Sequence, residues 1–367
     1  MLSFLSTLFY FIIVLTIIVF VHEFGHFFVA RKCGVKIEEF AIGMGKKLFG
    51  YKDKNGVLWK FCLFPIGGYV RMYGDDNASS FGGYSENPTA DELKYSLIYK
   101  HPLKKILVAF AGPLMNFVLA FLLFLFLFSI HGKPIAKPII SEVLKSSQAE
   151  KAGILPNDTI LSINGIKIET FNDIRNNLQR TKDADSQDGK NNVSMEITRQ
   201  LKTTNKLQKP QTIQLNFQFN KNEPFGIIGK TVQYQKIGFI RAIGDSCMSI
   251  QNITTGTAKA LWNIIIHQHG MKNIGGPIAI AKESARAGHN GFWAFLYFIA
   301  LISVSLGAIN LIPIPMLDGG HVFINFVELV SRRKFSNFAY KIFVIIGIAF
   351  IAFLMGLGFI NDIFINR

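Results

Sequence analysis

Cysteine and acidic residues are both scarce in this chain of 367 residues. Only three cysteines occur and no two of them form a C-x-x-C pair, which excludes a disulfide framework and a structural zinc ribbon. Asp and Glu number 24 against 39 Lys and Arg, a formal net charge of +15. Because the basic residues are spread over all the polar segments, they favour a membrane surface over nucleic acid as their partner.

Charged residues are absent from four long stretches of the chain. Half of all residues are hydrophobic, and apolar runs without any charge occupy residues 4–21, 106–130, 291–317 and 342–360. Each run is long enough to cross a bilayer core of about 30 Å. The first has no basic residue before it and is longer than the apolar part of a signal peptide, so we expect it to be retained. The composition predicts a membrane protein with room for one soluble domain.

The basic residues of the short loops predict which way the chain is inserted. Clusters at 31–32, 104–105 and 332–334 flank the apolar runs and are expected on the cytoplasmic side. The N-terminus, the C-terminus and the long segment 131–289 then lie outside. A segment of that length is translocated regardless of its charge.

The end of the first apolar run carries the sequence His22-Glu23-Phe24-Gly25-His26. Residues four apart lie on one face of a helix, so His22 and His26 can offer two ring nitrogens to one metal ion. Glu23 lies beside the pair and can take a proton from a water molecule at that metal. The alternative is a surface helix with two solvated histidines. Ionisable side chains at the end of an apolar span are costly, which favours the metal site.

A third ligand is expected at the end of the third apolar run. Two histidines leave a catalytic zinc site one protein ligand short, and Asp318 is the only acidic residue between positions 283 and 328. Two prolines just before Asp318 would loosen the helix there. His321 is a competing ligand, and Asp318 could instead cap a turn. The predicted topology places His267 and His269 across the membrane from His22, so we do not expect them to be ligands.

The cytoplasmic segment and the second run hold candidates for contact with substrate. Residues 35–42 and 57–72 are β-prone, and a hairpin there would expose an edge, around Gly67-Gly68-Tyr69, that could pair with an unwound substrate strand. It could equally be a structural cover. Residues 75–93 are expected to form a flexible loop. Asn116, an amide at membrane depth, is a candidate for contact with substrate or for support of a ligand.

Residues 138–232 are expected to fold as a soluble domain. Their order of strands and helices resembles a PDZ domain, of which one copy fits, and a lid or spacer that binds no peptide is the alternative. The region 243–269 has the pattern of an interfacial helix, and the Gly-Gly-Pro break in 273–281 could be re-entrant or interfacial. In the soluble domain, strands are expected at 139–143, 158–165, 193–198 and 212–219 and helices at 148–153 and 171–179.

Six ordered motifs together resemble the site-2 protease family of zinc intramembrane metalloproteases. The resemblance implies that His22, His26 and Asp318 bind Zn²⁺ and that Glu23 is the catalytic base. It also implies that the loop at Gly67, Gly68 and Tyr69 clamps substrate as a strand and that Asn310 contacts substrate. The best-known members carry a tandem pair of PDZ domains, whereas this chain has room for one. The motifs are HEFGH at 22–26, FPIGGY at 64–69, GPLMN at 112–116, the PDZ-like insert, GPI at 276–278 and NLIPIPMLDG at 310–319.

These observations predict a polytopic α-helical membrane protein with four transmembrane helices, a cytoplasmic membrane-associated β-hairpin region and one inserted extracytoplasmic PDZ-like α+β domain. By family analogy, it would lie in the bacterial inner membrane and cut transmembrane segments of single-pass proteins, such as an anti-sigma factor or signal-peptide remnants. A peptide could bind at the PDZ-like domain. The rival functions are a non-catalytic PDZ-bearing adaptor and a metal transporter. The expected boundaries are 1–34, 35–102, 103–131, 132–233, 234–290, 291–330 and 331–367.

Overall fold

The chain divides into two compact units in a computed structural model. One unit comprises Met1–Phe128 and Gly238–Arg367, and the other is Ser129–Ile237. We call them the membrane unit and the inserted unit. The structure describes residues 3–74, 89–183, 190–199, 202–203, 206–207, 210–220, 223–229, 232–267 and 275–364.

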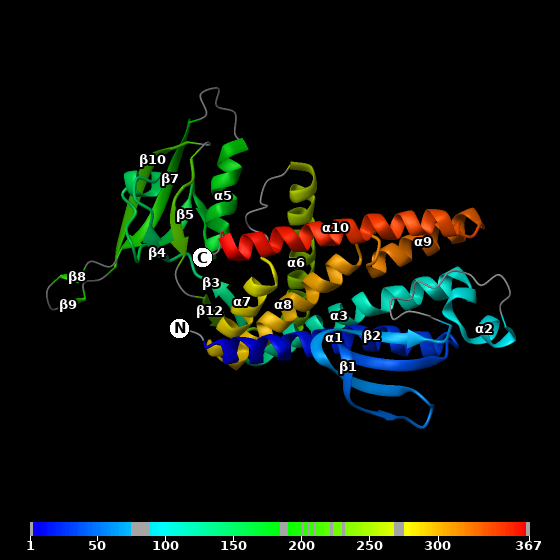
Figure 1. Cartoon of the computed structure of the whole chain (residues 1–367). Helices are drawn as coiled ribbons and strands as arrows, with labels where there is room; N and C mark the ends of the chain where they lie inside the picture. Colours follow the sequence, from blue (N-terminus) through cyan, green and yellow to red (C-terminus); the bar gives the residue numbers. More distant parts are fainter. Residues whose placement is uncertain are drawn as a thin grey trace. The chain divides into compact units, whose positions relative to one another are not determined.

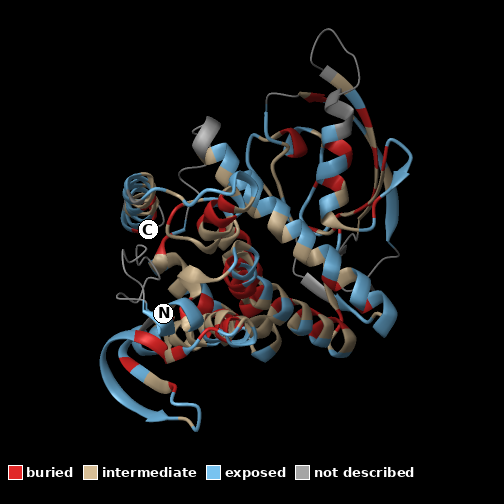
Figure 2. Ribbon diagram, turned by 90° about the vertical axis from the view of Figure 1, so that its right-hand side faces the viewer, coloured by how far each residue is buried: buried red, intermediate tan, exposed pale blue. Residues whose placement is uncertain are grey.

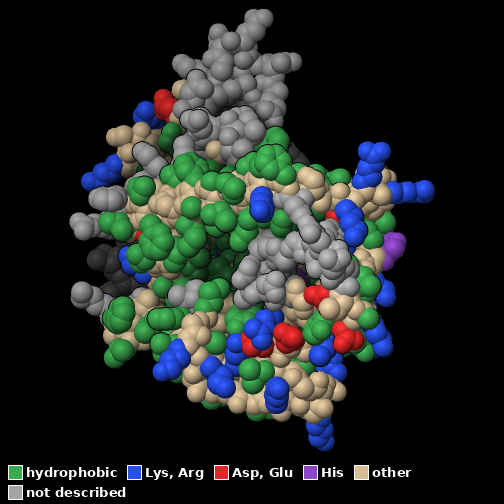
Figure 3. Space-filling view, turned by 45° about the vertical axis from the view of Figure 1, so that its right-hand side comes forward, with side chains coloured by type: hydrophobic (Ala, Val, Ile, Leu, Met, Phe, Trp, Pro, Cys, Tyr) green, Lys and Arg blue, Asp and Glu red, His purple; other side chains and the backbone are tan. Residues whose placement is uncertain are grey.

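The membrane unit contains four helices that are long and apolar enough to cross a bilayer within the described part of the chain. Only 11% of the most apolar 18 residues of α1 are buried against the rest of the protein, so most of that helix needs an apolar surrounding. Figure 3 shows hydrophobic side chains gathered into one broad area, with Lys and Arg mainly at its margins. Each of the four predicted apolar runs thus supplies one such helix, the third only over its first part, and the chain is a multi-pass membrane protein. The helices are α1 (Phe4–Lys32), α3 (Pro102–Ile130), α8 (Phe292–Asn310) and α10 (Asn337–Phe364).

The third apolar run is not one continuous helix. Helix α8 ends at Asn310, and α9 (Asp318–Ser331) begins after a break of seven residues. Pro313 and Pro315 lie in the break and supply no backbone N–H, so regular helical hydrogen bonding cannot continue through it. Met316 has a positive φ of 75°. The break therefore makes Asp318 the first residue of a new helix.

Two amphipathic helices precede α8. Helix α6 (Phe239–His267), predicted as interfacial, runs across the direction of α1, α3 and α10 (Figure 1). Helix α7 (Pro277–His289) packs on α1, and the Gly-Gly-Pro break is its start. The buried carboxylate of Asp362 accepts the backbone N–H groups of Gly276 and Ile278, both at 2.9 Å. A side chain from α10 thus caps α7.

A sheet of two long, bent strands follows α1. β1 (Ile37–Lys52) pairs with β2 (Leu58–Met72), and the first half of β1 pairs with both halves of β2. The stretch 68–72 of β2 has partners on β1 alone among the described residues, so it forms an edge of the sheet. Figure 2 shows that much of the sheet is exposed and that its buried residues lie in patches.

The predicted loop at 75–93 is partly wrong. Residues 75–88 lie outside the described part of the chain, but α2 (Ala90–Tyr95) is a short helix followed by a 3₁₀ turn, Leu97–Tyr99. Thr89 accepts the N–H of Glu92 at 3.2 Å, and Glu92 accepts the N–H of Thr89 at 2.6 Å. This reciprocal cap stabilises the helix start.

The inserted unit is an α+β fold with helix α5 on one face of its sheets (Figure 1). Its largest sheet has the strand order β10-β7-β5-β6, and the smaller sheets are β11-β4, β12-β3 and β8-β9. The predicted strands and helices of this region are present. The elements are β3 (Lys133–Ala136), β4 (Ile140–Val143), α4 (Gln148–Lys151), β5 (Thr159–Ile163), β6 (Ile166–Lys167), α5 (Phe171–Asp183), β7 (Lys190–Arg199), β8 (Lys202–Thr203), β9 (Lys206–Leu207), β10 (Gln211–Asn220), β11 (Ile227–Gly229) and β12 (Val232–Gln235).

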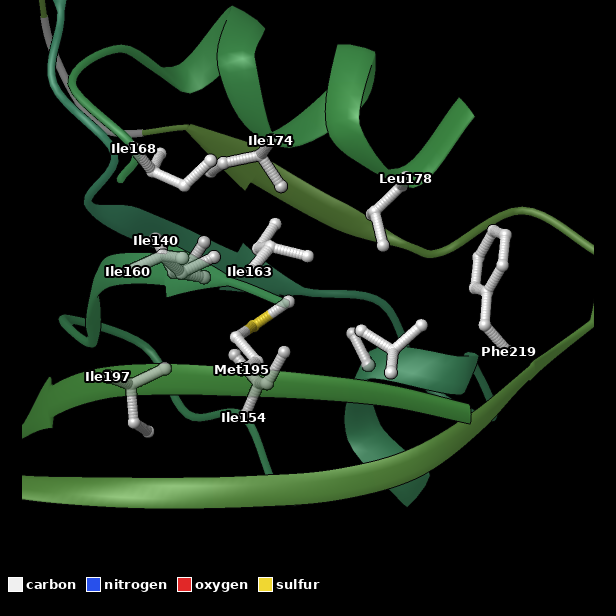
Figure 4. Close-up of a cluster of buried hydrophobic side chains, with 12 residues drawn as sticks. Ile140, Ile154, Ile160, Ile163, Ile168, Ile174, Leu178, Met195, Ile197 and Phe219 are labelled. Carbon is white, nitrogen blue, oxygen red and sulfur yellow. The ribbon is translucent and has the colours of Figure 1, made fainter. Parts of the chain in front are cut away.

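The core of the inserted unit is a contiguous cluster of aliphatic side chains. Ile174 and Leu178 point from α5 toward the strands, where they meet residues such as Ile163 and Met195 (Figure 4). Beside this core, the fully buried carboxylate of Asp158 accepts two hydrogen bonds from Arg199, at 2.8 and 2.7 Å. The hydrogen bond to Asp158 raises the pKa of the Arg199 guanidinium above its ordinary value.

Candidate metal centre

The first span presents both histidines to the interior of the membrane unit. Val14, Ile18, His22 and Gly25 are buried on one face of α1, at helical spacing. The rings of His22 and His26 lie edge to face with their centroids 4.9 Å apart. Their Nε2 atoms are 3.2 Å apart. The predicted pairing of the two rings on one helix face is therefore present in the structure.

Asp318 completes a cluster of three potential ligands. Its Oδ2 lies 3.1 Å from Nε2 of His22, and its Oδ1 lies 3.3 Å from Nε2 of His26. A tetrahedral ion with bonds of about 2.0–2.1 Å holds its ligand atoms about 3.3 Å from one another. The three side chains thus fit the donor set and the spacing of a zinc site. Among the described residues, these three side chains form a group whose potential ligand atoms all lie within 4.8 Å of one another.

Helix α3 supports the two imidazoles from behind. The Nδ1–H group of His26 donates to the carbonyl oxygen of Val108 at 2.8 Å, and Nδ1 of His22 lies 3.1 Å from the amide nitrogen of Asn116. Gly112 lies between these contacts, one turn from each. A Cβ atom at Gly112 would lie 2.2 Å from Nε2 of His26, so no side chain can be accommodated there. Helices α1 and α3 can approach this closely because glycine stands at the crossing.

Glu23 faces the sheet. A Cβ atom on Gly68 would lie 3.1 Å from Cγ of Glu23 and 2.8 Å from a methyl group of Val19, so β2 passes directly beside the acid. Gly68 belongs to the edge stretch 68–72. The geometry therefore brings a candidate base and an available strand edge together.

The other predicted contact residues occupy different positions. Gly67 has a positive φ of 81° and directly precedes the edge stretch within β2. The hydroxyl group of Tyr69 donates to Glu39 at 3.2 Å, which directs the ring away from Gly68 and toward the other face of the sheet. Asn310 is the last residue of α8, at the start of the break that leads to Asp318.

Glu39 is the centre of a charged cluster that stabilises the sheet. Its carboxylate accepts a hydrogen bond from Arg71 at 2.6 Å and another from Lys60. Partial burial acts to raise the pKa of Glu39, but the hydrogen bond and charge of Lys60, with the charge of Arg71, outweigh it and hold that pKa below its ordinary value. The cluster joins β1 to both halves of β2 next to the candidate site.

A buried ion pair near the site was not predicted from the sequence. Lys105, which was expected to be a cytoplasmic charge that determines topology, is buried and lies 3.1 Å from the carboxylate of Glu328. Glu328 also accepts the backbone N–H of Phe335 at 3.0 Å. The pair joins α3 to α9, the helix that begins with Asp318. Neither residue forms a local motif, so only the tertiary structure reveals the pair.

Among the histidines whose side chains the structure describes, only His22 and His26 belong to the cluster of three. His321, the competing ligand, lies one turn beyond Asp318 and is not a member. The side chain of His267 and the whole of His269 lie outside the described residues. Among the described side chains, the structure thus brings Asp318, and not His321, to the imidazole pair.

Two histidines and a glutamate on the spanning helix α1, with a carboxylate supplied by the start of α9, are the residues that a zinc metallopeptidase site requires. The comparison with known families agrees. The model of peptidase family M50 matches residues 10–354, and the chain belongs to that family.

Bacterial relatives support the same assignment. A protein of Rhizobium meliloti is 34% identical over 362 residues, covering 96% of this chain and 95% of the relative. One of Rickettsia conorii is 36% identical over 359 residues, covering 96% and 97%. One of Campylobacter jejuni is 35% identical over 360 residues, covering 96% and 92%. Each is named "putative zinc metalloprotease". The prediction of a membrane zinc peptidase of the site-2 type is confirmed at the level of the family.

Proposed function

We propose that this protein hydrolyses a peptide bond within a membrane-spanning segment of its substrate, with His22, His26 and Asp318 as the zinc ligands and Glu23 as the general base. The observation that carries the proposal is the meeting of three side chains: the Nε2 atoms of His22 and His26 lie 3.2 Å apart, and one carboxylate oxygen of Asp318 lies 3.1 Å from the first while the other lies 3.3 Å from the second. Zinc bound there would acidify a water molecule and polarise the scissile carbonyl group. Glu23 then takes the proton of the attacking water and returns it to the leaving amine.

The sheet edge supports a particular way of presenting substrate. A helical substrate has its carbonyl groups bonded internally, so part of it has to unwind before attack. The edge stretch 68–72 offers backbone groups that can pair with the unwound segment. Because Gly68 has no side chain, such a strand can lie close to Glu23. Gly67 and Gly68 thus act as substrate-binding residues through their backbone. Asn310, at the start of the break that leads to Asp318, is a further substrate contact in this proposal.

The natural substrates are proposed by class. Single-pass membrane proteins suit a site reached from the lipid, and anti-sigma factors or signal-peptide remnants are the examples that the family suggests. Binding of the segment would be governed by its ability to unwind near the ligands. Helix-breaking residues close to the scissile bond are therefore expected to favour cleavage.

Cleavage of a purified single-span substrate in detergent tests the proposal. Wild-type protein is expected to cut it, and both Glu23→Gln and Asp318→Asn are expected to abolish cutting. Zinc content separates the roles, because Glu23→Gln should retain the metal whereas Asp318→Asn should lose it. The matched control is Glu283→Gln, the same change at an exposed position of α7. Cleavage that survives Glu23→Gln would overturn the proposed mechanism.

We further propose that the inserted unit is a PDZ-like domain on the extracytoplasmic side of the bacterial inner membrane, where it could bind peptide or limit substrate size. The basic clusters at the ends of α1 and α9 support the cytoplasmic placement of those ends. In a chain whose three cysteines are replaced by serine, Ile166→Cys should react with an impermeant maleimide on intact cells. The matched exposed site, Tyr51→Cys, should not. The reverse pattern would contradict the topology.

A further inference from the structure

Three residues of α3, each one turn from the next, contact the candidate zinc ligands of α1. Val108 accepts the Nδ1–H of His26, Gly112 makes room for both rings, and Asn116 lies against Nδ1 of His22. Each imidazole is therefore engaged at Nδ1 by α3, while its Nε2 faces Asp318. The two rings differ in the partner that α3 offers, a backbone carbonyl for one and a side-chain amide for the other.

The amide of Asn116 is closely confined. The residue has no exposed surface, and its Oδ1 has no hydrogen-bond partner among the described residues. Ser303 of α8 donates to the backbone carbonyl of Asn116 at 2.8 Å, and Gly307 of α8 allows close packing, since a Cβ there would lie 3.3 Å from Cβ of Asn116. The backbone is thus fixed by α8, and the amide group retains one main freedom, a half-turn about the Cβ–Cγ bond.

The position of the proton on the His22 imidazole selects one orientation of this amide. An imidazole that binds a metal through Nε2 carries its proton on Nδ1 and needs an acceptor there. Val108 already supplies one to His26, because a carbonyl group can only accept. The neighbour of Nδ1 of His22 is the amide group of Asn116. The amide nitrogen, a donor, lies 3.1 Å from Nδ1, while the amide oxygen has no hydrogen-bond partner among the residues that the structure describes. A half-turn exchanges the two atoms, gives the oxygen a partner and gives Nδ1–H an acceptor.

We propose that Asn116 is a positioning residue that accepts the Nδ1–H of His22 and so holds that imidazole with Nε2 toward the metal. The inference rests on the proposed zinc-ligand role of His22. It assigns to Asn116 a role behind the ligand, remote from the substrate. A substrate contact would require access from the strand edge beside Glu23, whereas the amide is fully buried between α1, α3 and α8.

Zinc affinity, measured by competition with a chromophoric chelator, tests this role. Asn116→Leu removes the acceptor and keeps the volume, and it should weaken zinc binding by about 10- to 100-fold. Asn116→Asp keeps an acceptor oxygen, so it should stay within a few-fold of wild type. The control Ser246→Ala removes a buried hydrogen bond within α6, to the carbonyl oxygen of Ala242, and should leave affinity unchanged. The absorption bands of the cobalt-substituted protein should shift in Asn116→Leu but not in Asn116→Asp or Ser246→Ala.

The outcomes separate this inference from the proposed function. If Asn116→Leu folds and binds zinc and cobalt as wild type does, or if it only raises KM, Asn116 is not a positioning residue. If Asn116→Leu does not fold, Asn116→Asp decides, because equal loss of zinc in that variant contradicts the acceptor role. Zinc binding that survives His22→Ala would instead overturn the ligand assignment itself.

Discussion

The interiors of the two units are built from different residues. The inserted unit encloses a cluster in which Ile dominates, with Ile140, Ile160 and Ile197 fully buried. In the membrane unit, many of the fully buried positions are small or polar, such as Ala30, Asn116, Ser284, Ala300 and Ser303. The inserted unit has the core of a protein that folds in water, where burial of apolar surface is the main driving force.

The difference shows what holds the site together. Helices in lipid gain little from burying apolar side chains, so close backbone contact and hydrogen bonds hold them together. The two imidazoles that are candidate ligands are accordingly aligned by a glycine at the helix crossing, a backbone carbonyl group and a side-chain amide. We expect the site to be sensitive to a single added methyl group and insensitive to small changes in the inserted core.

Gly112→Ala should have the largest effect. The added Cβ would lie 2.2 Å from Nε2 of His26 and 2.8 Å from Cε1 of His22, so the rings have to move. Displacement of this size should reduce cleavage by about 100-fold or more. The measurements are cleavage rate and zinc content in detergent. The matched control is Gly356→Ala in α10, where no atom lies within 4 Å of the added Cβ. Equal activity of the two variants would break the comparison.

Glu39→Gln should have an intermediate effect that depends on pH. Because the pKa of Glu39 is lowered in the folded protein, its ionised carboxylate stabilises the fold at pH values above its ordinary pKa. This contribution is lost as the pH falls through the lowered pKa. At pH 7 the variant should be less stable by about 1–3 kcal/mol, and the difference should vanish in acid. Thermal unfolding at several pH values measures it. Glu38→Gln, with its single 3.3 Å ion pair, should change stability less. A difference that grows in acid would refute the assignment.

Ile163→Val should have the smallest effect. Removal of one methylene group from the inserted core should cost that unit about 0.5–1.5 kcal/mol and leave zinc binding unchanged. Hydrogen exchange of the β5 and β7 amides in the full-length protein reports the change. The control is Ile166→Val on β6, because Ile166 is 50% exposed whereas Ile163 is 1% exposed. If Ile163→Val impaired zinc binding, the two units could not be treated as separately stabilised.

The local parts of the site could be predicted from the sequence. His22, Glu23 and His26 form a motif within two turns of one helix, and the absence of other acids made Asp318 conspicuous. The third run was predicted as one span because its apolar character continues through the prolines, although its helix, α8, ends at Asn310 and residues 311–317 form the break before α9. The pair Thr89 and Glu92 has the spacing of a helix cap and could have predicted the start of α2, but the polar residues around it favoured a loop.

The supporting contacts could not be predicted, because they join residues that are far apart in the chain. Gly112 had the character of an ordinary helix-packing glycine, and nothing in its neighbours indicates that two imidazoles rest on it. Lys105 had the character of a surface charge until Glu328 was found beside it. Asp362 is one polar residue at the end of an apolar run, and its role as a cap appears only with the start of α7 in place.

The ribosome makes the residues of the proposed zinc site at very different times. Both imidazoles emerge within α1, whereas the carboxylate of Asp318 follows only after the inserted unit and α8. Under the proposed ligand assignment, a nascent or truncated chain that lacks α9 holds two donors and no complete site. Under that assignment, a copy without α9 would be unable to cleave neighbouring membrane proteins, because catalytic competence would wait until α9 has been made.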